Sequence, residues 1–296
     1  KILKHDLPLG GFGISRYTLD HELVKIARAN GVTVMENCRV NDVIFHEGKF
    51  RLETQTGTYV STACSGTFGK RSNLDIKWQR PFVTNRPGKL NNYIGVKYHV
   101  KTTFPEDTIA LHNFRNGYCG ISRVEGEKYC FCYLTTAANL KLHHNQISEM
   151  EKAVLSKNPE LKKLFVNMEI LSPEPVVISQ VSFEKKSTIE QHLMMSGDAA
   201  GMIAPLCGNG MSMAMHAGKL AAQLLVSFLQ GNISRDEMER QYSLQWNKHF
   251  EKRLATGRMI QRMFGKPLLT NMFISTMASF PKAVDFLIRQ THGRPF

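Results

Sequence analysis

LMMSGDAAGMIAPLCGNGM, residues 193–211, is the stretch that decides the fold of this chain. The apolar run Leu193–Met195 predicts a strand, a glycine-punctuated loop follows it, and Met211–Gln230 predicts a helix. A strand, a loop and a helix start bring free backbone N–H groups and the positive end of a helix dipole to one point. Such an arrangement suits an anionic or electron-rich ligand.

Four residues of this loop indicate ligand contact. Asp198 follows the strand, where its carboxylate can accept hydrogen bonds from ligand hydroxyls. Pro205 stiffens the loop, while Gly208 and Gly210 allow the backbone to approach a ligand where a Cβ would clash. A tight strand–helix turn with a capping Asp is the alternative interpretation of a bare Gly-Asp pair. The full spacing favours a ligand site.

The run GDAAGMIAPLCGNGMSMAMHAGKLAA, residues 197–222, resembles the second FAD-binding motif of the flavoprotein group that includes aromatic hydroxylases and geranylgeranyl reductases. In that family the Asp holds the ribityl chain, and the loop and helix start lie against the isoalloxazine ring. Reduced flavin carries negative charge near N1, which a helix N-terminus stabilises. The resemblance therefore implies FAD as the cofactor, with contacts from Gly197, Asp198, Pro205, Gly208, Asn209, Gly210 and Met211.

Two further segments fit the same resemblance. Ile14–Asp20 opens a helical stretch that ends before Gly31, and Arg16 matches an arginine that reaches the FAD in the family. A solvated position at the helix start is the alternative for Arg16. Val32–Met35 then predicts a short strand, and Val40 aligns with the family's strand whose backbone meets the adenine.

The third segment is Ala63–Ser72, where the resemblance makes Gly66 a cofactor contact. In the hydroxylases the corresponding stretch carries an Asp-Gly pair that serves both FAD and NADPH. That Asp is absent here, and Lys70 and Arg71 add positive charge instead. The basic turn either lies beside a diphosphate or forms a solvated loop. NAD(P)H is kept as a candidate electron donor.

Members of the family begin with a strand, a G-x-G-x-x-G loop and a helix whose N-terminus receives the FAD diphosphate. The sequence shows no such unit: Gly10–Gly13 is glycine-rich, but no apolar strand precedes it. We therefore expect a family member that lacks the first βαβ unit. We also expect these 296 residues to bind FAD weakly by themselves, because a diphosphate is costly to bury without partners.

The middle of the chain predicts a sheet-rich insertion, which in the family is the substrate domain. Strand-like runs fall at 93–103, 108–114, 118–124, 128–135 and 176–183, with a helical stretch at 145–157 and an earlier hairpin at 50–62. The expected fold class is α/β: an FAD-binding Rossmann-like domain of the glutathione-reductase type, N-terminally incomplete, with an inserted mixed β-sheet substrate domain and a helical C-terminus. The expected division is 1–80 and 186–230 for the FAD-binding domain, 81–185 for the substrate domain, and 231–296 for the helical segment.

Composition indicates a globular enzyme with a real core. Hydrophobic residues make up 42% and charged residues 21% of the chain. No apolar run reaches the length of about 18 residues that a spanning helix needs. The six cysteines have spacings of neither a zinc site nor a disulfide framework, which predicts no metal site and a cytoplasmic setting.

The formal net charge of +13 is unevenly spread. Residues 248–296 hold nine Lys and Arg against Glu251 and Asp285, and they are also rich in Met, Phe and Leu. Helical spacing with these basic flanks favours a helical segment that packs on the FAD-binding domain with its charges solvated, and the alternative is peripheral contact with an anionic membrane surface. No basic-aromatic recognition motif is visible, so nucleic acid is not an expected partner.

Two classes of function agree with these patterns: a flavin-dependent enzyme, and a non-catalytic remnant that kept the fold. Within the enzyme class, a flavoprotein monooxygenase acting on an aromatic or polyketide-like hydrophobic small molecule is the favoured interpretation. The alternative is a flavin-dependent reductase that saturates double bonds of an isoprenoid lipid. No catalytic side chain is assigned, because the cofactor carries the chemistry in this family.

Overall fold

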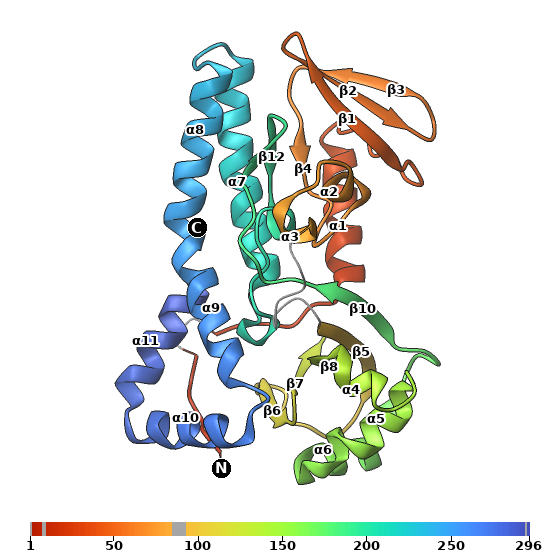
Figure 1. Cartoon of the computed structure of the whole chain (residues 1–296), viewed down its shortest axis with the longest axis vertical. Coiled ribbons are helices and arrows are strands. Elements are labelled where there is room, and N and C mark those ends of the chain that lie inside the picture. The colour runs from red at the N-terminus through yellow and green to blue at the C-terminus, as the bar shows by residue number, and fades with distance from the viewer. Residues whose placement is uncertain (1, 8–9, 85–92, 294) are drawn as a thin grey trace. The chain divides into compact units, whose positions relative to one another are not determined.

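The computed structural model describes residues 2–7, 10–84, 93–293 and 295–296, which divide into two compact units (Figure 1). Unit 1 comprises 1–35, 92–181 and 260–285, and unit 2 comprises 36–91, 182–259 and 286–296. The elements in chain order are α1 (Arg16–Ala29), β1 (Val40–His46), β2 (Lys49–Thr54), β3 (Thr58–Ser61), β4 (Ser65–Gly66), α2 (Asn73–Lys77), α3 (Pro81–Thr84), β5 (Tyr93–Lys101), β6 (Ala110–Phe114), β7 (Gly117–Val124), β8 (Lys128–Thr136), α4 (Ala137–Lys141), α5 (Ile147–Ala153), η1 (Leu155–Lys157), α6 (Pro159–Asn167), β9 (Glu169–Ile170), β10 (Val176–Val181), β11 (Ile189–Glu190), β12 (Leu193–Met195), η2 (Gly197–Ala199), η3 (Pro205–Cys207), α7 (Gly210–Leu229), α8 (Arg235–Trp246), η4 (Asn247–Glu251), α9 (Lys252–Met263), α10 (Pro267–Ser279) and α11 (Pro281–His292).

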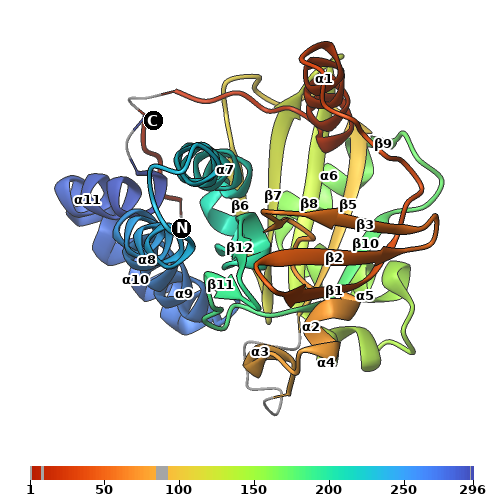
Figure 2. The ribbon, with the colours of Figure 1, turned by 90° about the horizontal axis from the view of Figure 1, so that it is seen from above.

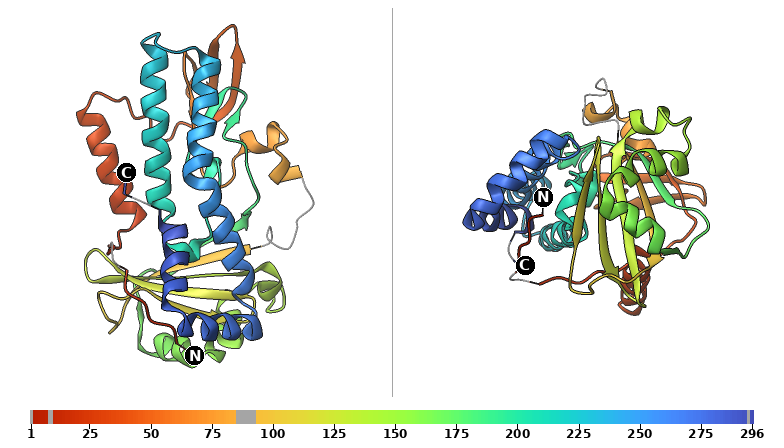
Figure 3. Two further views of the ribbon diagram at one scale, coloured as in Figure 1. Left: turned by 90° about the vertical axis from the view of Figure 1, so that its left-hand side faces the viewer. Right: turned by 90° about the horizontal axis from the view of Figure 1, so that it is seen from below.

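Unit 1 is built on a six-stranded sheet in the order β10-β5-β8-β7-β6, with β9 pairing β5, and each neighbouring pair is antiparallel. The helices between β8 and β9 lie across one face of this sheet, as the right panel of Figure 3 shows. Alternation along the strands sends Val96, Tyr98 and Phe131 into the core under these helices. There Tyr98 and Tyr133 both donate their hydroxyl protons to the Glu151 carboxylate, each over 2.8 Å.

The helix α1 begins where the sequence predicts it. Ser15 is the N-cap and accepts a hydrogen bond from the Thr18 amide. Glu125, in the turn between β7 and β8, accepts from the Ser15 amide at 2.8 Å and from the Thr18 hydroxyl at 2.8 Å. These hydrogen bonds lower the pKa of Glu125 to about 2, and the hydrogen bond from the Ser15 side chain has the largest effect. The start of α1 is therefore tied to the sheet of unit 1.

Unit 2 contains two small sheets and the helix pair α7 and α8. The strands β1, β2 and β3 form an antiparallel meander, seen edge to edge in Figure 2. The second sheet has the order β11-β12-β4, in which β12 and β4 run parallel. Tyr242 of α8 donates its hydroxyl proton to the Met195 carbonyl at 2.6 Å, which holds the end of β12 against the helices. The left panel of Figure 3 shows α7 and α8 side by side.

Most elements predicted from the sequence are present. The strand before Gly-Asp, the long helix after the loop, the hairpin and the helical C-terminus all appear within a few residues of the predicted bounds. The predicted strand Val32–Met35 is wrong, because these residues have no regular secondary structure. A strand needs a hydrogen-bonded neighbour, and none of the described strands pairs with this segment. Within the described residues, no helix is both long and apolar enough to cross a bilayer.

Candidate cofactor site

The loop after β12 turns sharply at Gly197, whose φ is +61°. A Cβ there would lie 3.3 Å from the Cβ of Ala214 in α7, so glycine meets both a conformational and a packing requirement. The next residues, Gly197–Ala199, form the short 3₁₀ turn η2, and this turn places Asp198 half-buried at the carboxyl end of β12. The strand–loop–helix arrangement predicted from the sequence is therefore confirmed.

The second half of the loop leads into the N-terminus of α7. Gly208 has a φ of +69°, and no atom lies within 4 Å of the position its Cβ would take. The helix then runs from Gly210 to Leu229, and its N-cap Asn209 makes no side-chain capping hydrogen bond. The first N–H groups of this 20-residue helix thus receive no side-chain cap from Asn209.

Asn209 has a different partner, at the C-terminal end of α11. Its side-chain amide donates to the Thr291 carbonyl, which also accepts from Arg253 Nε at 3.1 Å. Arg253 Nη2 donates to the His292 carbonyl at 2.6 Å, so two unpaired carbonyls at the end of α11 are satisfied. The Asn209 side chain therefore anchors the loop to α11.

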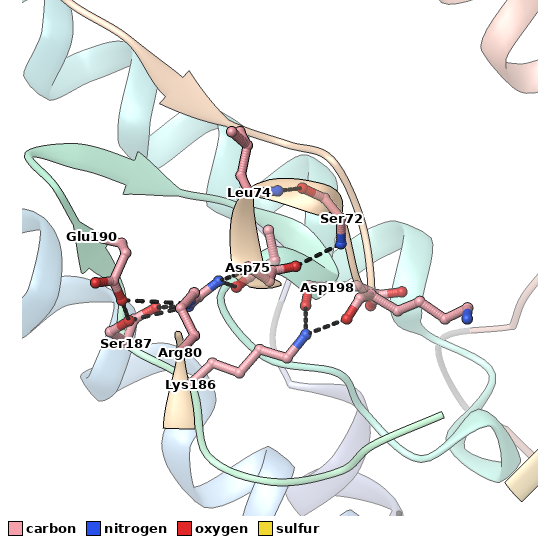
Figure 4. Close-up of polar contacts among 10 residues, drawn as sticks. Ser72, Leu74, Asp75, Arg80, Lys186, Ser187, Glu190 and Asp198 are labelled. Carbon is pink, nitrogen blue, oxygen red and sulfur yellow. Dashed lines mark hydrogen bonds and ion pairs between the residues drawn. The ribbon is translucent and has the colours of Figure 1, made fainter. Parts of the chain in front are cut away.

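A buried ion pair lies under the η2 turn (Figure 4). Arg80 and Asp75 are 1% and 0% exposed, and Arg80 Nη1 donates to Asp75 Oδ1 at 2.8 Å. The same nitrogen donates to the Ala199 carbonyl at 3.1 Å. Arg80 Nη2 donates to both oxygens of Ser187, and Arg80 Nε lies 3.3 Å from Glu190 Oε2. The guanidinium therefore connects Asp75 and the segment 187–190 to the turn.

Lys186 supplies a second buried cation at the same turn (Figure 4). Its ammonium donates to the Asp198 carbonyl at 2.7 Å and to the Lys70 carbonyl at 2.8 Å. It also lies 4.2 Å from the centre of the Phe82 ring. Burial lowers the pKa of Lys186 to about 8, with Asp75 and Asp198 opposing that shift.

Positive charge also surrounds the Asp198 side chain. Burial and the neighbouring Arg71 lower the pKa of Lys70, while the Asp198 carboxylate acts in the opposite direction. The basic turn noted in the sequence thus lies within electrostatic range of Asp198. Lys70, Arg71 and Lys186 make this part of unit 2 suitable for an anion.

The other residues predicted to contact the cofactor lie at the ends of strands, in a 3₁₀ turn and in the first turn of α7. Gly66 ends β4, where its carbonyl accepts from the Ser196 amide at 3.0 Å, and a Cβ would meet Met195 Sδ at 2.5 Å. Val40 begins β1, and its carbonyl accepts from Asn73 Nδ2 at 3.4 Å. Pro205 opens the 3₁₀ turn η3, and Met211 lies in the first turn of α7. These residues all belong to unit 2.

Arg16 belongs to unit 1 and is described within that unit. It is the first residue of α1, and its side chain is 67% exposed. Its guanidinium pairs with Asp20 one turn later, at 2.8 Å between Nη2 and Oδ2. In unit 1 the residue thus supports the first turn of its own helix.

Three residues that support the η2 turn escaped the sequence analysis: Asp75, Arg80 and Lys186. A signal existed for Asp75, because Ser72-x-x-Asp75 has the spacing of a capping box, and both hydrogen bonds of that box are present. No local pattern distinguishes Arg80 or Lys186 from solvated basic residues. Their partners come from segments distant in the sequence, as the carbonyl of Ala199 does for Arg80.

The site fits the ribityl and ring part of a flavin. A carboxylate that can accept hydroxyl hydrogen bonds, Asp198, stands at one end of the loop. At the other end, uncapped N–H groups of α7 and the open space at Gly208 can receive a polarised carbonyl or an anionic ring edge. The chemical character of the site therefore matches the cofactor that the sequence implied.

The fold is that of the FAD-binding flavoproteins. The chain matches the flavin-dependent brominase Bmp2 with a TM-score of 0.74 at 17% identity, covering 94% of this chain and 70% of that one. It matches a geranylgeranyl bacteriochlorophyll reductase-like protein of Thermoplasma acidophilum with a TM-score of 0.70 at 17% identity, covering 94% and 72%. It matches Klebsiella pneumoniae HpxO, solved with FAD and uric acid, with a TM-score of 0.70 at 15% identity, covering 94% and 71%.

The sequence relatives include a receptor and two archaeal reductases. The chain is 25% identical over 246 residues to Conditioned medium factor receptor 1 of Dictyostelium discoideum, covering 77% of this chain and 46% of that protein. It is 23% identical over 196 residues to the digeranylgeranylglycerophospholipid reductase of Methanococcus vannielii, covering 54% and 50%. It is 23% identical over 296 residues to digeranylgeranylglycerophospholipid reductase 1 of Methanococcoides burtonii, covering 93% and 67%.

The chain spans about half the length of the first two of these relatives, 46% and 50%. No family model matches it.

Proposed function

We propose that this protein is an FAD-dependent oxidoreductase acting on a hydrophobic small molecule. The observation that carries the proposal is the N-terminus of α7, which has no side-chain cap and follows Gly208, beside whose Cβ position no atom lies within 4 Å. FAD would supply the transfer of a hydride or of electrons, which no protein side chain performs.

The residues of unit 2 have distinct roles in this proposal. Asp198 accepts hydrogen bonds from the ribityl hydroxyls, and the first turn of α7 stabilises negative charge that develops on the reduced ring. Lys186 and Arg80 hold the turn itself, because they donate to the carbonyls of Asp198 and Ala199. A turn held in this way keeps the Asp198 carboxylate oriented before the cofactor binds.

Two reactions compete within this function. Hydroxylation of an aromatic or polyketide-like molecule is the interpretation that the sequence motifs favoured. Saturation of isoprenoid double bonds is supported by the names of the archaeal relatives, one of which aligns with 93% of this chain. We place reduction of an isoprenoid chain first, with hydroxylation as the second candidate and NAD(P)H as a candidate electron donor for either.

The experiment uses the full-length protein. Its absorbance spectrum and chromatography of the released cofactor should identify bound FAD. A preparation that neither contains flavin nor binds added FAD would overturn the proposal and favour a non-catalytic member of the fold.

The second measurement separates the two reactions. Chemically reduced protein is mixed anaerobically with an unsaturated isoprenoid lipid, and the product is examined by mass spectrometry for added hydrogen. Reoxidation of the flavin by the lipid without oxygen indicates reduction. Oxygen consumption that is stimulated by an aromatic substrate and yields a hydroxylated product indicates the monooxygenase.

A further inference from the structure

The exposed side of α10 is uncharged and carries large apolar side chains, with Asn271, Thr276 and Ser279 as its exposed polar residues. Residues 267–281 contain no charged side chain, and Thr270 is the buried residue of the helix. Leu268 and Met272, one turn apart, are 87% and 64% exposed, and Phe280 just beyond the helix is 59% exposed. Exposed apolar side chains scattered singly are ordinary, but a contiguous group on one helix face indicates a contact surface.

The opposite side of α10 packs against the rest of unit 1. The turn before the helix is fixed at Gly265, whose carbonyl accepts from the Asn116 amide at 2.7 Å and whose amide donates to Asn113 Oδ1 at 3.1 Å. Phe273 of α10 packs edge-on against Phe264, with ring centres 6.4 Å apart. Figure 1 shows α10 beside the β6 end of the sheet.

The charges around the apolar face have one sign. Lys266 directly precedes α10, Lys282 follows it, and Arg262 lies in the last turn of α9; all three are exposed. Asp285 is the single acidic residue in the sequence of 260–285, and it is paired with His5 at 2.9 Å. The face therefore has a basic border that attracts an anionic partner and repels a second copy of the same face.

We propose that α10 docks on the surface of an anionic lipid bilayer. Leu268, Met272 and Phe280 enter the boundary between head groups and acyl chains, and Lys266 and Lys282 contact the lipid phosphates. The helix has 13 residues, so at 1.5 Å per residue it spans about 20 Å, short of a hydrocarbon core of about 30 Å. It therefore lies in the interface plane. The inference needs no flavin and is independent of the proposed function.

The test is co-sedimentation of the purified chain with phosphatidylglycerol–phosphatidylcholine vesicles, compared with pure phosphatidylcholine vesicles. The chain should sediment with the anionic vesicles, and added salt should weaken the binding because exposed charges are screened. Lys266→Gln and Lys282→Gln should each weaken the partition by about fivefold. The double variant Leu268→Glu/Met272→Glu should abolish it.

Matched controls come from exposed residues elsewhere in unit 1. Leu142→Glu/Val166→Glu places the same new charges on exposed apolar positions at the C-cap of α4 and in α6, and the single variants Lys141→Gln and Lys162→Gln each remove one exposed charge. These variants should sediment like the unmodified chain. Equal binding to neutral vesicles, or equal loss in the control variants, would overturn the proposal.

A dimer that Leu268→Glu dissociates, without vesicle binding by the unmodified chain, would also overturn the proposal. That outcome would assign the face to a second copy. Circular dichroism of each variant shows that the fold is intact. The lysine variants keep the test decisive if a glutamate variant unfolds.

Discussion

The ammonium nitrogen of Lys186 lies 2.7 Å from the backbone carbonyl oxygen of Asp198. The residue expected to contact the ribityl chain is therefore held through its backbone by a cation that is 6% exposed. A buried ammonium is costly unless its protons have partners, and here two carbonyls and the face of Phe82 provide them. Lys186 therefore couples the position of Asp198 to the packing beneath the turn.

Asp198→Ala in the full-length protein should weaken FAD binding while the fold remains intact. Loss of a hydrogen bond to a charged group costs about 1.5–3 kcal/mol, which corresponds to a rise in Kd of about 10- to 150-fold. Fluorescence titration with FAD measures the effect, and Asp107→Ala, an exposed carboxylate in a turn of unit 1, is the control. Unchanged affinity in the Asp198 variant would remove this residue from the site.

Gly210→Val should impair flavin binding more than it lowers stability. A Cβ at Gly210 meets only Ile203 Cγ2, at 3.8 Å, so the protein itself has room for the side chain. The added methyl groups would instead occupy the space in front of the α7 N-terminus. Gly218→Val, in the same helix and with nothing within 4 Å of its Cβ position, is the matched control. Equal flavin content in both variants would mean that the loop is only a turn.

Arg80→Ala should destabilise the protein by about 3–5 kcal/mol, because it leaves the Asp75 carboxylate buried without its partner. The matched control is Arg240→Ala, which breaks an exposed pair with Glu237 and should cost far less, because solvent screens that pair. Urea unfolding followed by circular dichroism measures both free energies. Similar losses of unfolding free energy in the two variants would show that the buried pair stabilises the protein no more than the exposed pair does.

Lys186 should make stability depend on pH in the alkaline range. Its pKa is about 8 in the folded protein against 10.5 for the free side chain, so the unfolded chain binds more protons between these values. Stability relative to Lys186→Met should therefore rise as pH increases from about 8 toward 10.5, by up to about 3 kcal/mol. Unfolding free energies of both proteins at about pH 7.5, 8.5 and 9.5 measure this dependence of stability on pH.

The control for this measurement is Lys185→Met, which removes the exposed neighbouring ammonium. The stability of the unmodified protein relative to Lys185→Met should show no comparable rise with pH. A parallel pH dependence for the unmodified protein and the Lys186 variant would contradict the depressed pKa.

Local sequence patterns predicted much of the fold. Alternation and turn residues located the strands of unit 1 within a few residues, because side-chain period and turn chemistry act over short distances. The pattern failed at Val32–Met35, where the residues favour a strand but no described strand pairs with them. Strand propensity expresses how well a residue fits a sheet, and it does not provide the neighbouring strand.

The sequence by itself determined where the glycines, the Asp198 carboxylate and the start of α7 fall, because strand, loop and helix follow one another without interruption along the chain. Only the tertiary structure decided what holds this loop. Arg80 meets the carbonyl of Ala199, 119 positions away, and Lys186 meets the carbonyl of Lys70, 116 positions away. The physical reason is that a buried cation is satisfied by the acceptors that tertiary packing brings within hydrogen-bond distance. Those acceptors come from separate segments, so local spacing along the chain does not predict them.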